Sequence, residues 1–298
     1  MATPAVVEAR DLVKIYGDGQ GVRALDGVSF TIQAGEFVAV MGPSGCGKST
    51  LLNLLGALDK PTSGTVIVAG QDLTKLRDAD RFRARTVGFV FQLHNLIPTL
   101  TALENVEVPM QGQGLGRRAR RERAEELLRL VGLGDRLHHL PAQLSGGQRQ
   151  KVAVARALAN NPAILLADEP TGNLDSVASA EIMDLLAKLN TEQGTTILVV
   201  THDPTVARQA RRVLLMRDGR IERDEPVGSV YEEDLKMLLR SELGQALLRS
   251  QDWHRLSQLT GLGLVRDGRL TAEGETLRRL LERVRASPSA PSPGGLGG

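Results

Sequence analysis

The sequence predicts an α/β fold whose core is a parallel β-sheet flanked by helices. Short apolar runs at residues 37–41, 164–167 and 197–200 are typical of strands that are buried on both faces. Segments with helical spacing of apolar residues separate these runs, as in strand–helix–strand units. Glycine is frequent, with 32 of 298 residues, which favours tight turns and close backbone contacts to a ligand.

The predicted elements follow one another in a regular order. Residues 28–33 alternate apolar and polar side chains, which predicts a half-buried strand. The strand at 37–41 runs into a glycine-rich segment and then into an apolar helix that extends to residue 58. Further strands are predicted at 64–69, 87–91, 164–167 and 195–201, and further helices at 117–131, 146–159 and 177–190.

Composition limits the class of protein. Hydrophobic residues at 41% and charged residues at 24% exclude wholesale disorder and are typical of a globular chain. The net charge of +2 argues against a function that rests on bulk affinity for nucleic acids. The single cysteine, Cys46, fits a reducing compartment. Because no apolar run approaches the ~18 residues of a membrane span and no secretory signal is visible, we expect a cytoplasmic protein.

Residues 42–50 form the first candidate site. They fit the phosphate-binding pattern G-x-x-x-x-G-K-S, placed between a strand and a helix. Glycines let backbone N–H groups curl around phosphate oxygens, and the helix N-terminus adds a favourable dipole. Lys48 is expected to reach the β- and γ-phosphates, and Ser49 to offer its hydroxyl to Mg²⁺. The whole predicted loop comprises Gly42, Pro43, Ser44, Gly45, Cys46, Gly47, Lys48, Ser49 and Thr50.

A pair of acidic residues forms the second candidate site. Asp168 and Glu169 follow the apolar strand at 164–167, at the strand end where α/β folds bind ligands. We expect Asp168 to hold Mg²⁺ and Glu169 to orient the attacking water or to accept its proton. A solvated turn would be the ordinary interpretation of such a pair, and the nearby phosphate loop makes it less plausible.

The third candidate site is the stretch Leu144-Ser-Gly-Gly-Gln148. Ser145 can cap the following helix, and a serine with two glycines at a helix N-terminus also makes an anion site. The three sites occur together, and the chain therefore resembles the ATP-binding cassette (ABC) ATPase family over about residues 5–228. The resemblance implies a P-loop NTPase fold, with an antiparallel β subdomain and with a helical subdomain at about residues 93–160.

The resemblance also implies roles that local sequence would not assign. Tyr16 matches the aromatic residue that stacks on adenine, and Gln92 matches the glutamine that contacts Mg²⁺ and the attacking water. His202 matches the histidine that contacts the γ-phosphate. The implied catalytic set is Lys48, Gln92, Glu169 and His202, and the implied Mg²⁺ ligands are Ser49, Gln92 and Asp168.

A head-to-tail dimer follows from the same resemblance. Two copies of the chain would enclose two ATP–Mg²⁺, each held by one subunit's phosphate loop and covered by Ser145, Gly146, Gly147 and Gln148 of the other. Residues 173–175 match the loop that crosses this interface. No catalytic position departs from the family's pattern, so an active ATPase is expected.

Two segments are similar to one branch of the family. Residues 91–106 and 166–175 resemble the branch that holds the lipoprotein-release (LolD) and macrolide-export (MacB) ATPases. That branch implies an integral-membrane permease as partner, with this chain peripheral on the inner face of the cell membrane. Leu96, Ile97 and Pro98 would line the groove for the permease, or would simply belong to the core. The cargo and the permease are not encoded in this chain.

A different class of function is also open. The alternative is a non-transport ABC ATPase with a regulatory or nucleic-acid-contacting C-terminal module. The run Arg117–Arg123 carries a local charge of +4, and a solvated helix face explains it better than nucleic-acid binding. We expect no nucleic-acid partner.

The region after residue 228 is a separate, mainly helical accessory domain. Leucines from 235 to 247 have helical spacing, and Asp267-Gly268 marks a hairpin turn before a final helix from Thr271. This order loosely resembles a winged-helix module, although residues 231–286 hold ten Lys or Arg against nine Asp or Glu. We predict domains at 1–228 and 229–286, with Trp253 in a small core, and a disordered tail at 287–298.

Overall fold

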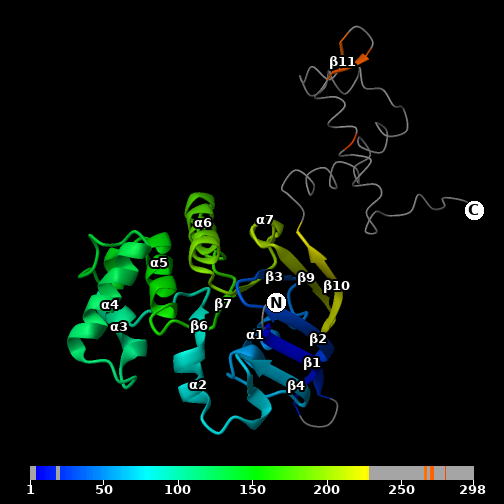
Figure 1. The fold of residues 1–298 in the computed structure, drawn as a ribbon, viewed down its shortest axis with the longest axis horizontal. Helices are drawn as coiled ribbons and strands as arrows, with labels where there is room; N and C mark the ends of the chain where they lie inside the picture. Colours follow the sequence, from blue (N-terminus) through cyan, green and yellow to red (C-terminus); the bar gives the residue numbers. More distant parts are fainter. Residues whose placement is uncertain (1–4, 18–20, 228–264, 267–268, 272–278, 280–298) are drawn as a thin grey trace, which may run out of the picture. The chain divides into compact units, whose positions relative to one another are not determined.

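A computed structural model describes residues 5–17, 21–227, 265–266, 269–271 and 279 of the chain (Figure 1). The chain divides into two compact units, residues 1–226 and 227–298. In the second unit, β11 (Val265–Arg266) pairs with β12 (Arg269–Leu270) in antiparallel fashion, which confirms the strands of the predicted hairpin. The predicted helices around 235–247 and after 271, Trp253 and the tail 287–298 lie outside the described residues.

A six-stranded sheet forms the centre of the first unit. Its order is β10-β9-β3-β8-β7-β6, and all neighbours except the first pair run parallel. The parallel strands are β3 (Phe37–Met41), β6 (Val87–Val90), β7 (Ile164–Asp168), β8 (Ile197–Thr201) and β9 (Arg212–Arg217), with β10 (Arg220–Pro226) antiparallel at the edge. The predicted parallel core is confirmed, and the β9–β10 hairpin is an addition that the sequence analysis missed.

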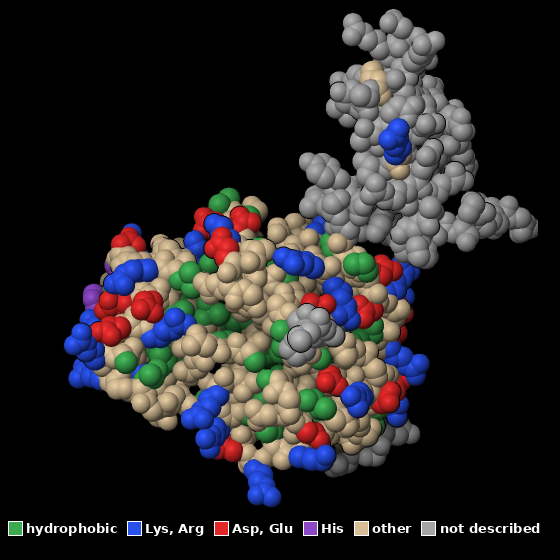
Figure 2. All heavy atoms as spheres, viewed as in Figure 1, with side chains coloured by type: hydrophobic (Ala, Val, Ile, Leu, Met, Phe, Trp, Pro, Cys, Tyr) green, Lys and Arg blue, Asp and Glu red, His purple; other side chains and the backbone are tan. Residues whose placement is uncertain are grey.

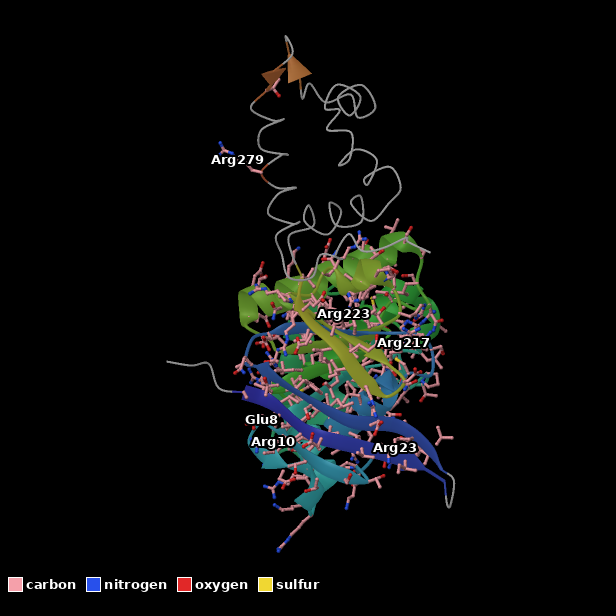
Figure 3. The ribbon with its side chains drawn as sticks, turned by 90° about the vertical axis from the view of Figure 1, so that its right-hand side faces the viewer. Glu8, Arg10, Arg23, Arg217, Arg223 and Arg279 are labelled. Carbon is pink, nitrogen blue, oxygen red and sulfur yellow. The ribbon has the colours of Figure 1, made fainter. Side chains whose placement is uncertain are left out.

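A second sheet is wholly antiparallel. Its order is β2-β1-β4-β5, formed by β1 (Ala5–Tyr16), β2 (Val22–Gln33), β4 (Ser63–Val68) and β5 (Gln71–Asp72). Figure 3 shows its strands from the side, with Glu8 and Arg10 on β1 and Arg23 on β2. The exposed pair Arg10–Glu8 lies 2.6 Å apart on this sheet. The antiparallel β subdomain implied by the family resemblance is therefore present.

Helices cover the sheets and form a group of their own. The helices are α1 (Lys48–Leu55), α2 (Ala79–Thr86), α3 (Ala102–Glu107), α4 (Arg117–Leu130), α5 (Gly146–Ala157), α6 (Ser176–Gln193) and α7 (Pro204–Ala207). Short 3₁₀ turns occur at Leu73–Lys75, Val108–Met110 and Pro141–Gln143. Figure 1 shows α3, α4 and α5 gathered at one side of the sheet, next to α6. Among the described residues, no helix combines the length and apolarity that a membrane span requires.

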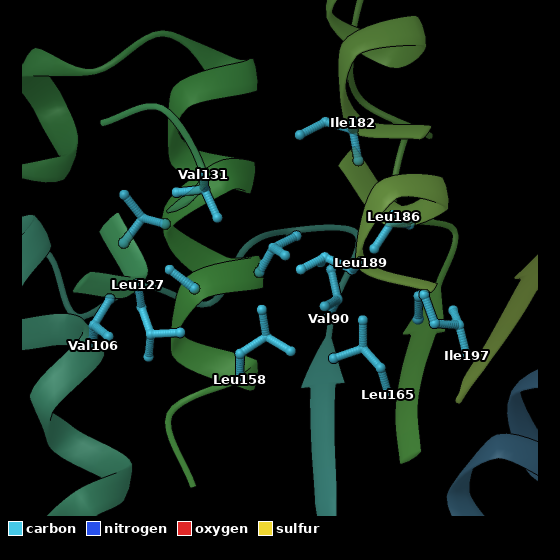
Figure 4. Close-up of a cluster of buried hydrophobic side chains, with 14 of the residues drawn as sticks. Val90, Val106, Leu127, Val131, Leu158, Leu165, Ile182, Leu186, Leu189 and Ile197 are labelled. Carbon is cyan, nitrogen blue, oxygen red and sulfur yellow. The ribbon is translucent and has the colours of Figure 1, made fainter. Parts of the chain in front are cut away.

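Two hydrophobic cores lie on opposite faces of the parallel sheet. Alternate residues of β3 point to different sides, because Phe37 and Ala39 belong to one core and Val38 and Val40 to the other. The first core joins the sheet to α3–α6, and Figure 4 shows Val90 and Leu165 of the sheet close to helical residues such as Leu189. The second core joins the parallel sheet to α1 and the antiparallel sheet.

Some predicted boundaries were wrong by a few residues. The strand expected at 195–201 begins at Ile197, because the end of α6 holds the preceding residues. Gly194 adopts a left-handed conformation with φ 65°, the Thr195 N–H donates to the Leu189 carbonyl at 3.2 Å, and the Thr195 carbonyl accepts from Asn190 Nδ2 at 2.9 Å. Thr195 is therefore held by the end of the helix, whereas the Thr196 carbonyl already accepts from the Leu165 N–H of β7 at 2.9 Å.

The arginine-rich helix α4 carries ion pairs along its own surface, although its six arginines outnumber its three glutamates. Arg118 pairs with Glu122 at 2.7 Å, and Glu125 binds both Arg121 at 3.4 Å and Arg129 at 2.9 Å. Figure 2 shows basic and acidic side chains interspersed over this part of the molecule. The pairs fit the interpretation of the run as a solvated helix face.

Candidate functional site

The phosphate loop between β3 and α1 has a shape that only glycine permits at two positions. A Cβ at Gly42 would lie 2.2 Å from the Met216 carbonyl oxygen. Gly47 has φ +105°, and a Cβ there would lie 2.4 Å from the Ala24 carbonyl oxygen. The loop is thus pressed between β2 and β9, so its backbone course is fixed by both sheets.

Lys48 is buried inside this loop. Its side chain folds back so that Nζ donates hydrogen bonds to the carbonyl oxygens of Gly42 at 2.8 Å and Pro43 at 2.9 Å. Only 6% of the residue is exposed. The start of α1 has no side-chain cap, so its first backbone N–H groups are available to an anion. The loop therefore concentrates one ammonium and several N–H donors.

Ser49 and Asp168 meet beside the loop. The Ser49 hydroxyl donates to Asp168 Oδ1 at 3.4 Å, joining the first turn of α1 to the end of β7. Burial raises the pKa of Asp168, and the neighbouring Glu169 charge raises it further, whereas the Ser49 hydrogen bond and Lys48 oppose the shift. No cluster of three His, Cys, Asp or Glu is found among the described residues. The Ser49 hydroxyl and the Asp168 carboxylate suit Mg²⁺, because this ion is usually bound by only one or two protein oxygens when phosphates and waters supply its other ligands.

Glu169 and His202 form a pair at the same sheet edge. His202 Nδ1 lies 2.8 Å from Glu169 Oε1. The two residues follow β7 and β8, whose parallel pairing sets Asp168 opposite Val200. Glu169 has φ 43°, a left-handed conformation that is strained for a non-glycine residue. This backbone turn aims its carboxylate at the histidine.

Gln92 lies at the end of the neighbouring strand β6. Val90 pairs with Ala167, so the residues after both strands share one edge of the sheet. The Gln92 carbonyl accepts from Asn173 Nδ2 at 3.3 Å, and a Cβ at Gly172 would lie 2.8 Å from Gln92 Nε2. Gln92 thus packs against the segment that follows Glu169. Within the described part of the chain, no hydrogen bond joins it to Ser49 or Asp168.

Tyr16 is held by two partners that the sequence analysis missed. Its hydroxyl donates to Asp59 Oδ2 at 2.9 Å, and Lys14 Nζ lies 4.8 Å from its ring centroid. Lys14 also donates to Asp59 Oδ1 at 2.7 Å. Although burial alone would raise the pKa of Asp59, hydrogen bonds from Lys14, the Lys60 N–H and Tyr16 lower it. The tyrosine is 39% exposed, so a pinned aromatic ring remains open to solvent.

The stretch 144–148 forms a separate site at the start of α5. Ser145 Oγ accepts from the Gln148 N–H at 3.2 Å, and Gln148 Oε1 accepts from the Ser145 N–H at 2.9 Å, a reciprocal capping box. A Cβ at Gly147 would lie 3.0 Å from Ala178 Cβ, so α5 and α6 approach closely at their starts. Among the described residues, no hydrogen bond links 145–148 to the phosphate loop.

Within the loop after Gln92, the sequence analysis singled out Leu96, Ile97 and Pro98 but not His94 and Asn95. His94 and Asn95 have φ 62° and 49°, and only 9% of His94 is exposed. Burial lowers the pKa of His94, and the charge of Arg149 lowers it further, whereas backbone hydrogen bonds at Leu93 and Gly146 act in the opposite direction. Two consecutive left-handed residues are a structural feature that composition does not reveal.

A cavity of about 360 Å³ lies apart from these residues. It is bordered by Arg85 of α2, by α4 and the residues before it, and by the segment after α5, which includes Asn161. None of its lining residues belongs to the predicted nucleotide site. The chemistry of the loop and sheet edge, rather than this hollow, marks the functional site.

Known proteins support this assignment. Residues 25–172 match the ABC transporter family. An ABC transporter ATP-binding protein of Thermotoga maritima is 54% identical over 229 residues, 76% of this chain and 97% of that protein. The macrolide export ATP-binding/permease protein MacB of Hyphomonas neptunium is 52% identical over 223 residues. That match covers 74% of this chain but only 34% of MacB, so the chain spans about a third of such relatives.

Solved structures give the same result. A dimeric ATP-binding cassette in a post-hydrolysis state, bound to ADP and Pi, is 48% identical with a TM-score of 0.68. The match covers 75% of this chain and 99% of that one. The sequence, the fold and these relatives agree that the chain belongs to the family of ABC transporter ATP-binding proteins.

Proposed function

We propose that this chain is the ATP-hydrolysing subunit of an ABC transporter complex. The observation that carries the proposal is the convergence of Lys48, Ser49–Asp168 and Glu169–His202 at one edge of the parallel sheet. Met41 is paired with Thr201, so the phosphate loop and His202 leave neighbouring strands side by side. Phosphate-binding, metal-binding and base functions are thus within reach of one ligand.

Residues 42–50 hold the phosphates in this proposal. Lys48 exchanges its two carbonyl acceptors for β- and γ-phosphate oxygens, with little change in the buried position of its ammonium. Lys14 lies over one face of the Tyr16 ring, and the opposite face stacks on adenine. The hydrogen bond to Asp59 keeps the ring oriented.

Ser49, Asp168 and Gln92 are the residues that would hold Mg²⁺. The ion supplies neutralisation of phosphate charge. Burial disfavours the ionised form of Asp168, and a nearby cation would stabilise this form. Metal binding is therefore expected to release protons from this group at low pH.

Glu169 and His202 carry out the proton chemistry. Glu169 orients a water and accepts its proton as the water attacks the γ-phosphate. His202 Nδ1 faces Glu169, which leaves Nε2 as the ring nitrogen for a phosphate oxygen. The two ring nitrogens can therefore contact Glu169 and a phosphate oxygen at the same time.

A second copy of the chain completes each site. Ser145, Gly146, Gly147 and Gln148 form an anion-binding helix start that, among the described residues, has no hydrogen bond to the phosphate loop of its own chain. A head-to-tail dimer would place this start over the partner subunit's ATP. The dimeric cassette related to this chain supports such an arrangement.

A membrane permease is the proposed partner outside the dimer. The related MacB proteins are ATP-binding/permease proteins of which this chain matches the smaller part. Leu93 is 73% exposed and Ile97 is 40% exposed, directly after Gln92, whereas Leu96 packs on the core. These two exposed side chains suit a docked permease segment that would hold the chain at the inner face of the membrane, as in the LolD/MacB-like branch. The cargo would be a lipoprotein, peptide, antibiotic or other amphiphile that the partner contacts.

The region after residue 228 supplies the alternative. Domains at 1–228 and 229–286 and a tail at 287–298 remain predictions, as does a regulatory or nucleic-acid-contacting role for the second of them. In that case, the chain would be a non-transport ABC ATPase.

One experiment separates the two functions. The variant Glu169→Gln, which can bind ATP but lacks the base, is captured with ATP and Mg²⁺ from solubilised membranes of the native host. We expect an integral-membrane permease to be enriched relative to the matched variant Lys48→Ala/Glu169→Gln, in which ATP binding is lost. Recovery of soluble proteins or nucleic acid alone would overturn the transport proposal and favour the alternative.

A further inference from the structure

The cavity of about 360 Å³ beside the start of helix α4 is lined by basic and amide side chains. Its polar lining consists of two arginines, one glutamine and two asparagines, with no Asp or Glu among the lining residues. They come from the end of α2, the residues before α4, α4 itself and the turn after α5. The polar members of this arginine pocket are Arg85, Gln113, Arg123, Asn160 and Asn161. A cavity that holds cations and no carboxylate favours an anion as its ligand.

Hydrogen bonds within the arginine pocket occupy most of its acceptor atoms. Arg85 Nε donates to Gln113 Oε1 at 3.0 Å, and Arg123 Nη2 donates to Asn161 Oδ1 at 2.6 Å. Each bond occupies an amide oxygen and leaves the NH₂ group of the same amide as a donor. Asn160 is oriented the other way, because its Nδ2 donates to two backbone carbonyls at 2.7 Å and its Oδ1 remains as an acceptor. Among the side chains of the pocket, free donors therefore outnumber free acceptors.

The two arginines keep donor groups that have no acceptor. Nε of Arg123 is buried and has no hydrogen-bond partner in the described part of the chain. Its Nη1 lies 3.6 Å from Glu126 Oε2, whose side chain is 63% exposed, so this surface pair neutralises the guanidinium only weakly. Among the described residues, the one hydrogen bond of the Arg85 side chain is that from Nε, so Nη1 and Nη2 are unpaired. A buried charged donor without a partner is unfavourable, and an anion in the pocket would satisfy it.

Helix α4 adds the positive end of its dipole to the pocket. Leu115 and Ala119, which precede and follow the N-cap residue Gly116, both line the cavity. The helix start has no side-chain cap and no acidic residue in its first turn, so its first backbone N–H groups remain available. At the end of α5, by contrast, the Leu158 carbonyl is occupied by the Asn161 N–H at 3.1 Å. An uncapped helix start beside two guanidinium groups is a favourable place for an anion.

We infer that the arginine pocket binds a phosphoryl group, at a site distinct from the nucleotide site. Guanidinium groups match phosphate oxygens with paired N–H donors. The donors of Arg85, Gln113, Arg123 and Asn161 come from four segments, which suits the tetrahedral oxygens of a phosphate better than a planar carboxylate. A cavity of about 360 Å³ has room for a phosphate ester with a small polar group, whose hydroxyl can donate to Asn160 Oδ1. The inference goes beyond the proposed function and does not depend on it.

Two sources can present this chemistry to the pocket, a soluble phosphate ester and the headgroup of an anionic phospholipid. The six arginines and three glutamates of α4 give the helix a positive surface that attracts either of them. The choice of probe distinguishes the sources. Glycerol 3-phosphate represents the soluble ester, and vesicles of phosphatidylglycerol mixed with phosphatidylcholine represent the lipid.

Two variants of the pocket and one matched control test the inference. Arg85→Gln/Arg123→Gln removes both guanidinium groups and keeps polar side chains in their place. The control Arg118→Gln/Arg129→Gln removes the same charge from α4 at residues that do not line the cavity. Ala119→Glu keeps both arginines and places a carboxylate at an exposed lining position. Because this third variant leaves the hydrogen bonds of the pocket intact, a folding defect of the first variant does not decide the outcome.

All chains are full-length, and ADP–Mg²⁺ is present to occupy the phosphate loop. Calorimetry with glycerol 3-phosphate and flotation with the vesicles are the two measurements, with acetate and pure phosphatidylcholine as reference probes. In at least one of them, we expect Arg85→Gln/Arg123→Gln to weaken binding about a hundredfold, since each charged contact is worth about tenfold. Ala119→Glu should weaken the same binding about tenfold, because its carboxylate repels the ligand. The control should stay within about twofold of the parent.

A selective loss in either measurement supports the site and identifies its source of phosphate. Loss with glycerol 3-phosphate indicates a soluble ester, and loss with the vesicles indicates a lipid headgroup. Equal losses in the pocket variants and the control, or a parent chain that binds neither probe, would overturn the inference. Acetate that binds as tightly as glycerol 3-phosphate would overturn the assignment to a phosphoryl group and indicate a carboxylate instead.

Discussion

At the scale of single residues, the site combines groups whose environments are unfavourable without ligand. Asp168 is an acid in a partly buried position next to a second acid, and Glu169 has a strained backbone. Lys48 uses main-chain carbonyls as partners. Each of these features costs free energy in the isolated chain and becomes favourable when phosphate and a cation are present. Such a trade between stability and activity is common at functional sites.

Asp168→Asn should make the nucleotide-free chain more stable at pH 7. Burial raises the pKa of Asp168 above its ordinary 3.8, so the folded chain holds this proton more tightly than the unfolded chain does. The stabilisation of the folded chain by protonated Asp168 is fully present below pH 3.8 and is lost as the pH rises through the pKa of the folded state. At neutral pH the ionised acid therefore destabilises the folded chain. Urea unfolding without nucleotide is the measurement, with exposed Asp135→Asn as the control.

The gain from Asp168→Asn should shrink as pH is lowered toward 3.8, because the folded chain then takes up the proton and no longer buries the ionised acid. ATP hydrolysis should be lost at every pH. A gain that is independent of pH, or a loss of stability at pH 7, would contradict this account of the carboxyl group.

At the scale of elements, parallel strands and capped helices set the position of each group. β3, β7 and β8 end at one sheet edge, which explains why residues far apart in sequence share a site. Helix α5 starts at a reciprocal cap between Ser145 and Gln148. The cap and the anion-binding role use the same N–H groups, so the helix start has to satisfy both.

Ser145→Ala should lower the free energy of unfolding by about 1 kcal/mol, the usual cost of a lost N-cap. It should also abolish ATP-dependent dimerisation while leaving ATP binding to the phosphate loop intact, because the two sites are separate in one chain. Urea unfolding and sedimentation with ATP test both statements. Thr101→Ala removes the similar capping box of α3 and serves as the control, and it should reduce stability without affecting dimerisation.

At the scale of the whole molecule, the sequence predicted the parallel core and the phosphate loop well. Val38 and Ile197 lie in runs whose apolarity is unambiguous, and the loop has a fixed pattern. The hairpin β9–β10 and helix α3 were missed because their residues are mixed in character. The partners Lys14 and Asp59 of Tyr16 were missed because they are 45 residues apart in the chain and meet only when the segment before β4 packs against β1. Distances of this kind depend on register, which periodicity does not report.

A chain ending at residue 228 should fold cooperatively and bind ATP like the full-length chain. The first unit contains both hydrophobic cores and every residue of the proposed site. Thermal unfolding and ATP affinity of the two chains are the measurements, and values within about twofold in affinity are expected. An insoluble shortened chain, or one that no longer binds ATP, would show that the second unit is required for the fold of the first.

Because Cys46 is buried in the phosphate loop, its thiol can report on the opening of that loop. It is the only cysteine in the chain, it is 4% exposed, and its sulfur lies 3.9 Å from Lys48 Nζ. A thiol reagent therefore modifies the loop only when the loop opens, and the rate of labelling measures that opening without any introduced probe. A ligand that closes the loop should therefore lower the labelling rate of the Cys46 sulfur.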